Sequence, residues 1–89
     1  MKLKYDYAIQ ELLGEYVAVP IGVADDEPSR LVRLNGTAKV IFEGLMANHS
    51  VNQIAETLAG LCDMHPNEVI ADVESFIKTL AQKDLLVME

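Results

Sequence analysis

The sequence predicts an α+β fold in which a three-stranded antiparallel sheet is followed by three helices. In the first third of the chain, apolar residues recur at every second position, as they do along strands. From residue 36 onward they recur at the spacing of helices instead. The chain has 89 residues, of which 51% are hydrophobic, so a single domain over residues 1–89 with one hydrophobic core is expected.

Three strands are expected, at about residues 5–13, 15–22 and 30–34. The second is rich in β-branched and aromatic residues. A charged loop that contains a proline separates it from the third. Alternation along the third strand places Val32 and Leu34 on one face and Leu31 and Arg33 on the other.

Two structures compete at the Asn35-Gly36 pair. Between strands such a pair is a strong hairpin signal, but the residues that follow, such as Ile41 and Leu45, have helical spacing. That spacing favours a first helix over residues 36–47, with Asn35 as its N-cap.

The second and third helices are expected over residues 51–61 and 66–82. Ser50 and Gln53 form a capping box before the second helix, and Gly60 is expected to end it. Two apolar stripes run along the third helix, Val69, Val73, Phe76 and Leu80 in one and Ile70 and Ile77 in the other. The second stripe is either the margin of a wide buried face or spare surface of a binding groove.

The net charge of −7 is concentrated in the second half, where seven acidic and two basic residues follow residue 44. Two helices joined by a short turn beside a small sheet are typical of a winged helix-turn-helix, a fold that often binds DNA. The third helix, however, offers Asp72 and Glu74 where a recognition helix presents basic or amide side chains. We therefore expect the winged helix-turn-helix fold and keep a DNA-binding regulator as the alternative function.

No residue pattern predicts an enzyme, a metal site or a cofactor. Cys62 and His65 form a lone Cys-x-x-His without the second ligand pair of a structural zinc site. No Gly-rich phosphate loop is present. Because neither a signal peptide nor a membrane-length apolar run is found, a cytoplasmic protein without a membrane partner is expected.

Several motifs occur in a fixed order along residues 5–88. They are Gly14-Glu15-Tyr16-Val17-Ala18-Val19-Pro20-Ile21-Gly22 and Leu34-Asn35-Gly36-Thr37-Ala38, then Ser50-Val51, Ile54-Ala55 and Leu58-Ala59, and finally Asp72-Val73, Phe76-Ile77, Leu80 and Leu85-Leu86. This ordered set resembles the PqqD-like proteins, also called RiPP recognition elements. The sequence departs from the family pattern with His65 in place of a capping Asp, Asp84 in place of Gly and Cys62 in place of an aromatic residue.

The resemblance implies a stand-alone, non-catalytic adaptor that binds the leader of a ribosomally synthesised precursor peptide. In the family the leader adds as a strand to the edge of the third strand, over a groove next to the third helix. Carried over by position, the receiving edge is Arg30, Leu31, Val32, Arg33 and Leu34, and the groove wall is Ile70, Val73, Glu74 and Ile77. The implied second partner is a peptide-modifying enzyme, often a radical S-adenosylmethionine enzyme.

The two arginines of the receiving edge have two compatible roles. Arg30 and Arg33 are able to pair with acidic leader residues, and charge on an edge strand also prevents unwanted strand pairing. A dimer whose edge strands pair with each other is the third function class that the sequence leaves open.

Overall fold

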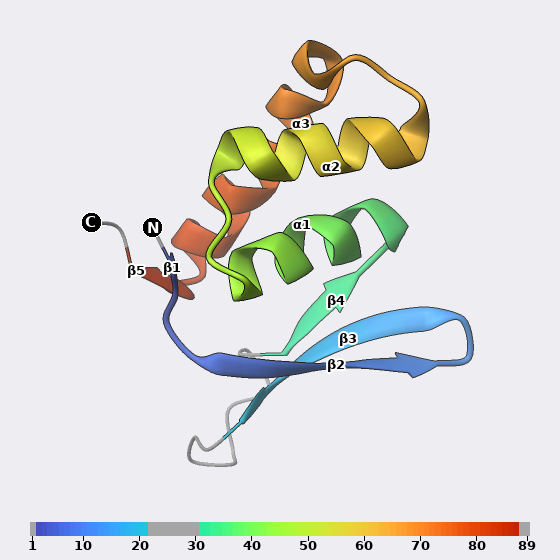
Figure 1. Ribbon diagram of the computed structural model, residues 1–89. Helices are drawn as coiled ribbons and strands as arrows, with labels where there is room; N and C mark the ends of the chain where they lie inside the picture. The colour runs from blue at the N-terminus through green and yellow to red at the C-terminus, as the bar shows by residue number, and fades with distance from the viewer. Residues whose placement is uncertain (1, 22–30, 88–89) are drawn as a thin grey trace.

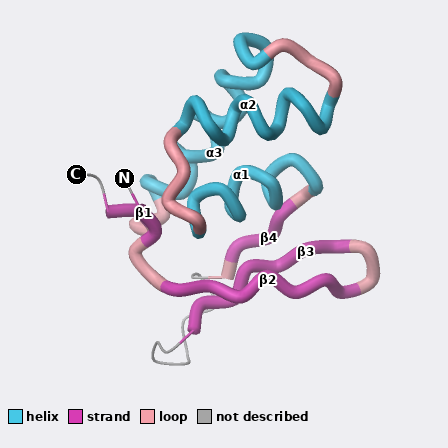
Figure 2. Tube along the Cα trace, viewed as in Figure 1, coloured by secondary structure: helices cyan, strands magenta, loops and turns pink. Residues whose placement is uncertain are grey.

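A computed structural model describes residues 2–21 and 31–87 of the chain. In chain order the elements are β1 (Lys2–Leu3), β2 (Asp6–Leu12), β3 (Glu15–Ile21), β4 (Val32–Leu34), α1 (Gly36–Met46), α2 (Val51–Cys62), α3 (Pro66–Gln82) and β5 (Leu86–Val87). The sheet β2-β3-β4 forms one layer and the helices form a second layer above it (Figures 1 and 2). This arrangement confirms the predicted fold class. Gly22 and Arg30, at the ends of two predicted strands, lie outside the described residues.

The three-stranded sheet is antiparallel throughout, and its register sets which side chains face the helices. Ala18 at the centre of β3 pairs with Val32 of β4 and is completely buried. The connection between β2 and β3 passes through Leu13 and Gly14, whose φ angles are 54° and 82°. Two successive positive φ angles are what a type I′ hairpin turn requires, and this turn matches the twist of the strands.

Side-chain caps fix where the helices begin. The Asn35 Oδ1 accepts a hydrogen bond of 2.8 Å from the Ala38 N–H, so the Asn-Gly pair starts α1 and not a hairpin. The Ser50–Gln53 capping box is present at α2. At α3 the His65 Nδ1 accepts from the Asn67 N–H at 3.3 Å, and the His65 N–H donates to Glu68 at 3.1 Å.

The helices end at residues with left-handed backbone conformation. These are Asn48 after α1, Asp63 after α2 and Asp84 after α3, with φ angles of 62°, 54° and 60°. The Asp84 and Leu85 N–H groups donate back to the Ala81 and Leu80 carbonyls at 3.0 Å, a Schellman pattern. The expected end of α2 at Gly60 is wrong. The helix continues to Cys62, and Asp63 caps its C-terminus in the left-handed conformation.

The hydrophobic face of α3 differs from the stripes expected from the sequence. Val69, Val73, Ile77 and Leu80 are buried, whereas Ile70 and Phe76 are only partly buried. The buried residues are spaced by four, four and three positions, which follows the 3.6-residue turn. Phe76 and Ile77 therefore exchange the roles predicted for them, and Ile70 and Phe76 flank the buried stripe on opposite sides.

The two ends of the described chain pair with each other, a feature that the sequence did not indicate. β1 and β5 form a two-stranded antiparallel sheet in which Leu3 lies opposite Leu86. The Lys4 N–H donates to the Leu85 carbonyl at 2.8 Å, and the Lys4 ammonium lies 2.8 Å from the Asp84 carboxylate. Leu85 and Leu86 are buried, so the C-terminal segment packs on the body of the domain.

Candidate functional site

The outer edge of β4 is the first component of the candidate site. β4 pairs with β3 on one side, and no described strand pairs with its other side. An edge strand of this kind presents backbone N–H and C=O groups that a further strand is able to bind. β2 is the other edge of the sheet, so a second criterion is needed to choose between the two edges.

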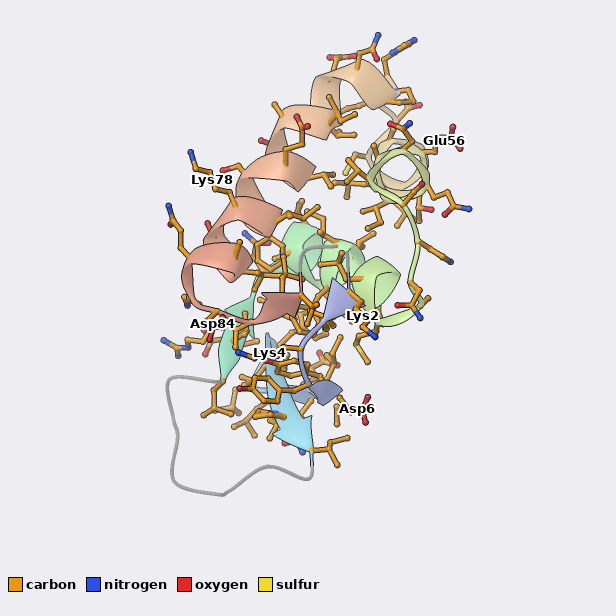
Figure 3. All side chains as sticks on the ribbon, turned by 90° about the vertical axis from the view of Figure 1, so that its left-hand side faces the viewer. Lys2, Lys4, Asp6, Glu56, Lys78 and Asp84 are labelled. Carbon is orange, nitrogen blue, oxygen red and sulfur yellow. The ribbon has the colours of Figure 1, made fainter. Side chains whose placement is uncertain are left out.

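The position of α3 distinguishes the two edges. Figure 3 shows α3 and β4 on the same side of the molecule, whereas Asp6 of β2 projects from the opposite side. Both α3 and β4 pack against α1, which holds them in place. In Figures 1 and 3 the C-terminal half of α3 lies closer to the sheet than its N-terminal half does. A strand added to β4 would therefore lie on the same side of the molecule as this half of α3.

The side chains of the predicted receiving edge divide into buried and exposed ones. Val32 and Leu34 are buried in the core, so they offer only their backbone to a partner. Leu31 is 41% exposed. The Arg33 side chain is 81% exposed, with its guanidinium 3.5 Å from the Glu15 carboxylate. Arg30 lies outside the described residues.

The predicted groove wall on α3 divides in the same way. Val73 is 0% exposed and Ile77 is 8% exposed, so these two side chains belong to the core. Ile70 is half-buried and Glu74 is exposed, so both reach the surface. Phe76, which the sequence analysis assigned to the core stripe, is also half-buried and reaches the surface. Fitting the stripe to 3.6 residues per turn places Phe76 at the margin instead.

A surface depression lies at the C-terminal end of β4. It has a volume of about 470 Å³ and is lined by Gly14, Glu15, Tyr16, Arg33, Leu34, Asn35 and Gly36. The Lys39 ammonium lies 5.1 Å from the centre of the Tyr16 ring and 3.2 Å from the Glu43 carboxylate. The depression thus lies where β3 begins and β4 ends, next to Arg33.

Metal-ligating side chains do not cluster in the described part of the chain. Within residues 2–21 and 31–87, no group of three or more His, Cys, Asp or Glu side chains has a geometry suited to a metal ion. Cys62 is an exposed free thiol and the His65 ring serves as the α3 cap. None of the helices in these ranges has the length and apolar character needed to cross a membrane.

The fold and the open edge define a small winged helix-turn-helix domain with a sheet edge available beside a helix. The chain belongs to the PqqD family, because the family model described as "Coenzyme PQQ synthesis protein D (PqqD)" matches residues 15–86. This match confirms the resemblance found in the sequence.

Individual relatives agree with this assignment. A "PqqA binding protein" of Xanthomonas campestris pv. campestris (strain 8004) is 39% identical over 59 residues, which is 66% of this chain. A protein of the same name from strain ATCC 33913 of that pathovar gives the same values. The chain spans 64% of the length of these curated relatives.

One solved structure shares the whole fold. It is TbiB1 in complex with the TbiA(beta) leader peptide, with a TM-score of 0.75 and 18% sequence identity. The match covers 100% of this chain and 98% of that one. At this identity the likeness establishes the fold.

Proposed function

We propose that this protein is a non-catalytic adaptor that binds the leader of a ribosomally synthesised precursor peptide through the open edge of β4. The observation that carries the proposal is the combination of that edge with α3 on the same side, in a member of the PqqD family. Two further facts support it: the relatives are named for binding PqqA, and the solved structure with the same fold holds a leader peptide.

In this proposal the backbone of β4 supplies affinity and side chains on both sides supply selectivity. The leader adds as a fourth strand, and its N–H and C=O groups pair with those of residues 31–34. Alternate leader side chains point toward the helices, where the exposed part of Phe76, in the half of α3 nearer the sheet, is available. Val73 and Ile77 hold that surface in place from beneath.

The proposed role of the adaptor is to raise the concentration of the precursor peptide near the modifying enzyme. An adaptor that holds the leader beside a modifying enzyme makes the encounter of substrate and active site intramolecular. We propose that such an enzyme, with radical S-adenosylmethionine chemistry as one class, carries out the reaction. We place the adaptor with it in the cytoplasm.

The two other function classes gain no support from the structure. For DNA binding, α3 exposes Asp72 and Glu74, and a net charge of −7 opposes contact with phosphates. For a dimer through β4, the register that pairs all three residues of the strand places Arg33 opposite Arg33 of the second copy. Like charges directly opposite each other destabilise a strand pair.

The proposal is tested by isothermal titration calorimetry with the leader peptide encoded beside the gene and with a DNA duplex at moderate salt. We expect the peptide to bind and the duplex not to bind. The substitution Phe76→Glu should weaken peptide binding about tenfold, because it places a charge in an apolar contact worth over 1 kcal/mol.

Ile70→Glu is the matched control, because Ile70 is also half-buried on α3 but lies in the half farther from the sheet. It should weaken binding less than Phe76→Glu. A folded wild-type protein that binds the duplex and ignores the peptide would overturn the proposed function. An Ile70→Glu effect larger than that of Phe76→Glu would place the wall on the N-terminal half of α3.

A further inference from the structure

We propose that the β4 site selects leaders that carry an acidic side chain beside Arg33. This inference rests on the proposed function and specifies its substrate class. A bound leader would alternate apolar residues that face the helices with residues on the outer face of the sheet, and one of the latter would be Asp or Glu.

The position of Arg33 carries the argument. It lies at the centre of β4 and pairs with Val17 of β3, so its side chain is on the face opposite to buried Val32 and Leu34. A residue directly across from it on an added strand would have its Cβ about 5 Å from that of Arg33. The outer face thus brings one leader side chain next to a guanidinium.

The ion pair with Glu15 leaves Arg33 able to contact a bound peptide. Glu15 contacts it through one nitrogen at 3.5 Å, and the two side chains are 81% and 66% exposed. An ion pair with this exposure contributes little free energy, so Arg33 is able to bind a second carboxylate or exchange partners. Val17, its direct neighbour on β3, is apolar and does not neutralise it.

A second base lies on the same side of the molecule. Lys78 projects outward from α3 on the side where β4 lies (Figure 3). Among the described residues, neither Lys78 nor Lys83 forms an ion pair. Glu74, one turn before Lys78, lowers the positive charge there, so we assign the selectivity to Arg33 and not to the helix. These bases favour an acidic peptide at this edge. A second copy paired through β4 would place Arg33 opposite Arg33 instead.

The inference is tested by reversing the charge at Arg33 and by varying the charge of the peptide. Three synthetic peptides alternate valine with Glu, Gln or Lys, and glycine-serine flanks keep them soluble. We expect wild-type protein to bind the Glu peptide best and the Lys peptide worst. Arg33→Glu should reverse this order, with a change of about fivefold for the Glu peptide, the upper range for one cross-strand charge pair.

Lys2→Glu is the matched control, because it makes the same change in net charge at an exposed position on β1. It should leave the order of the three peptides unchanged. Equal effects of Arg33→Glu and Lys2→Glu would show a general charge effect and overturn the inference. An order that Arg33→Glu does not alter would overturn it too.

Two measurements separate this inference from the proposed function. If the natural leader binds but the three peptides bind equally, only the acidic selectivity fails. If the natural leader does not bind either, the proposed function fails. Sedimentation equilibrium of the free protein should show a monomer, and a dimer strengthened by Arg33→Ala, which removes the like charges, would mean that a second copy occupies the edge.

Discussion

His65 shows how one side chain fixes the start of a helix. It stands where the family often has an aspartate, yet its Nδ1 accepts the hydrogen bond from the Asn67 N–H that a carboxylate would accept. Glu68 completes the cap by accepting from the His65 N–H, so backbone donors are paired at this end of α3. Asp84 at the other end occupies a left-handed position that favours glycine. Both departures from the family pattern thus preserve the geometry of α3.

Substitution at His65 should change stability without changing the fold. His65→Ala removes the acceptor and is expected to lower the free energy of unfolding by about 1 kcal/mol. His65→Asp restores a preferred N-cap and places a negative charge at the positive end of the helix dipole, so it should be at least as stable as wild type. Urea denaturation measures both variants. An Ala variant as stable as wild type would show that the cap contributes nothing.

At the scale of elements, the α1–α2 contact depends on a glycine. A Cβ added at Gly44 of α1 would lie 2.6 Å from Cγ1 of Ile54, which is buried on α2. Gly60 of α2 is the opposite case, because a Cβ there would meet nothing within 4 Å. One glycine therefore permits close helix packing, and the other only lowers helix propensity.

These two glycines give a matched pair of stability predictions. Gly44→Ala should destabilise the protein by about 1–3 kcal/mol, because overpacking at Ile54 exceeds the gain in helix propensity. Gly60→Ala should stabilise it by up to about 1 kcal/mol through propensity alone. Thermal unfolding followed by circular dichroism compares them. Two variants that shift the midpoint in the same direction would contradict the close contact.

The elements of the candidate site also show which substitutions are informative. Val73 was expected to line the groove, but it is completely buried. A glutamate at this position would place a carboxylate in the core, a change large enough to unfold a domain of this size. Val73→Glu therefore tests folding, and surface variants on α3 test binding.

At the scale of the whole molecule, local signals predicted most of the fold. Strand alternation, the Asn35 and Ser50 caps and the helical spacing were sufficient to predict the order of β2, β3, β4 and the three helices. The β1–β5 sheet was not predictable, because each strand has two residues and no periodicity develops over that length. Alternation along the third strand correctly placed Leu31 and Arg33 on its exposed face. Which margin of α3 lies toward β4 was not predictable, because it depends on how both elements pack against α1.

The central claim, that a leader adds as a strand to β4, is tested most directly by changing the peptide backbone. Two versions of the leader peptide, N-methylated at alternate residues in complementary sets, are titrated into the unmodified protein by calorimetry. In an added strand only every second N–H points toward β4, so one set should lose about tenfold or more in affinity while the other keeps most of it. Equal binding of the two sets would contradict strand addition.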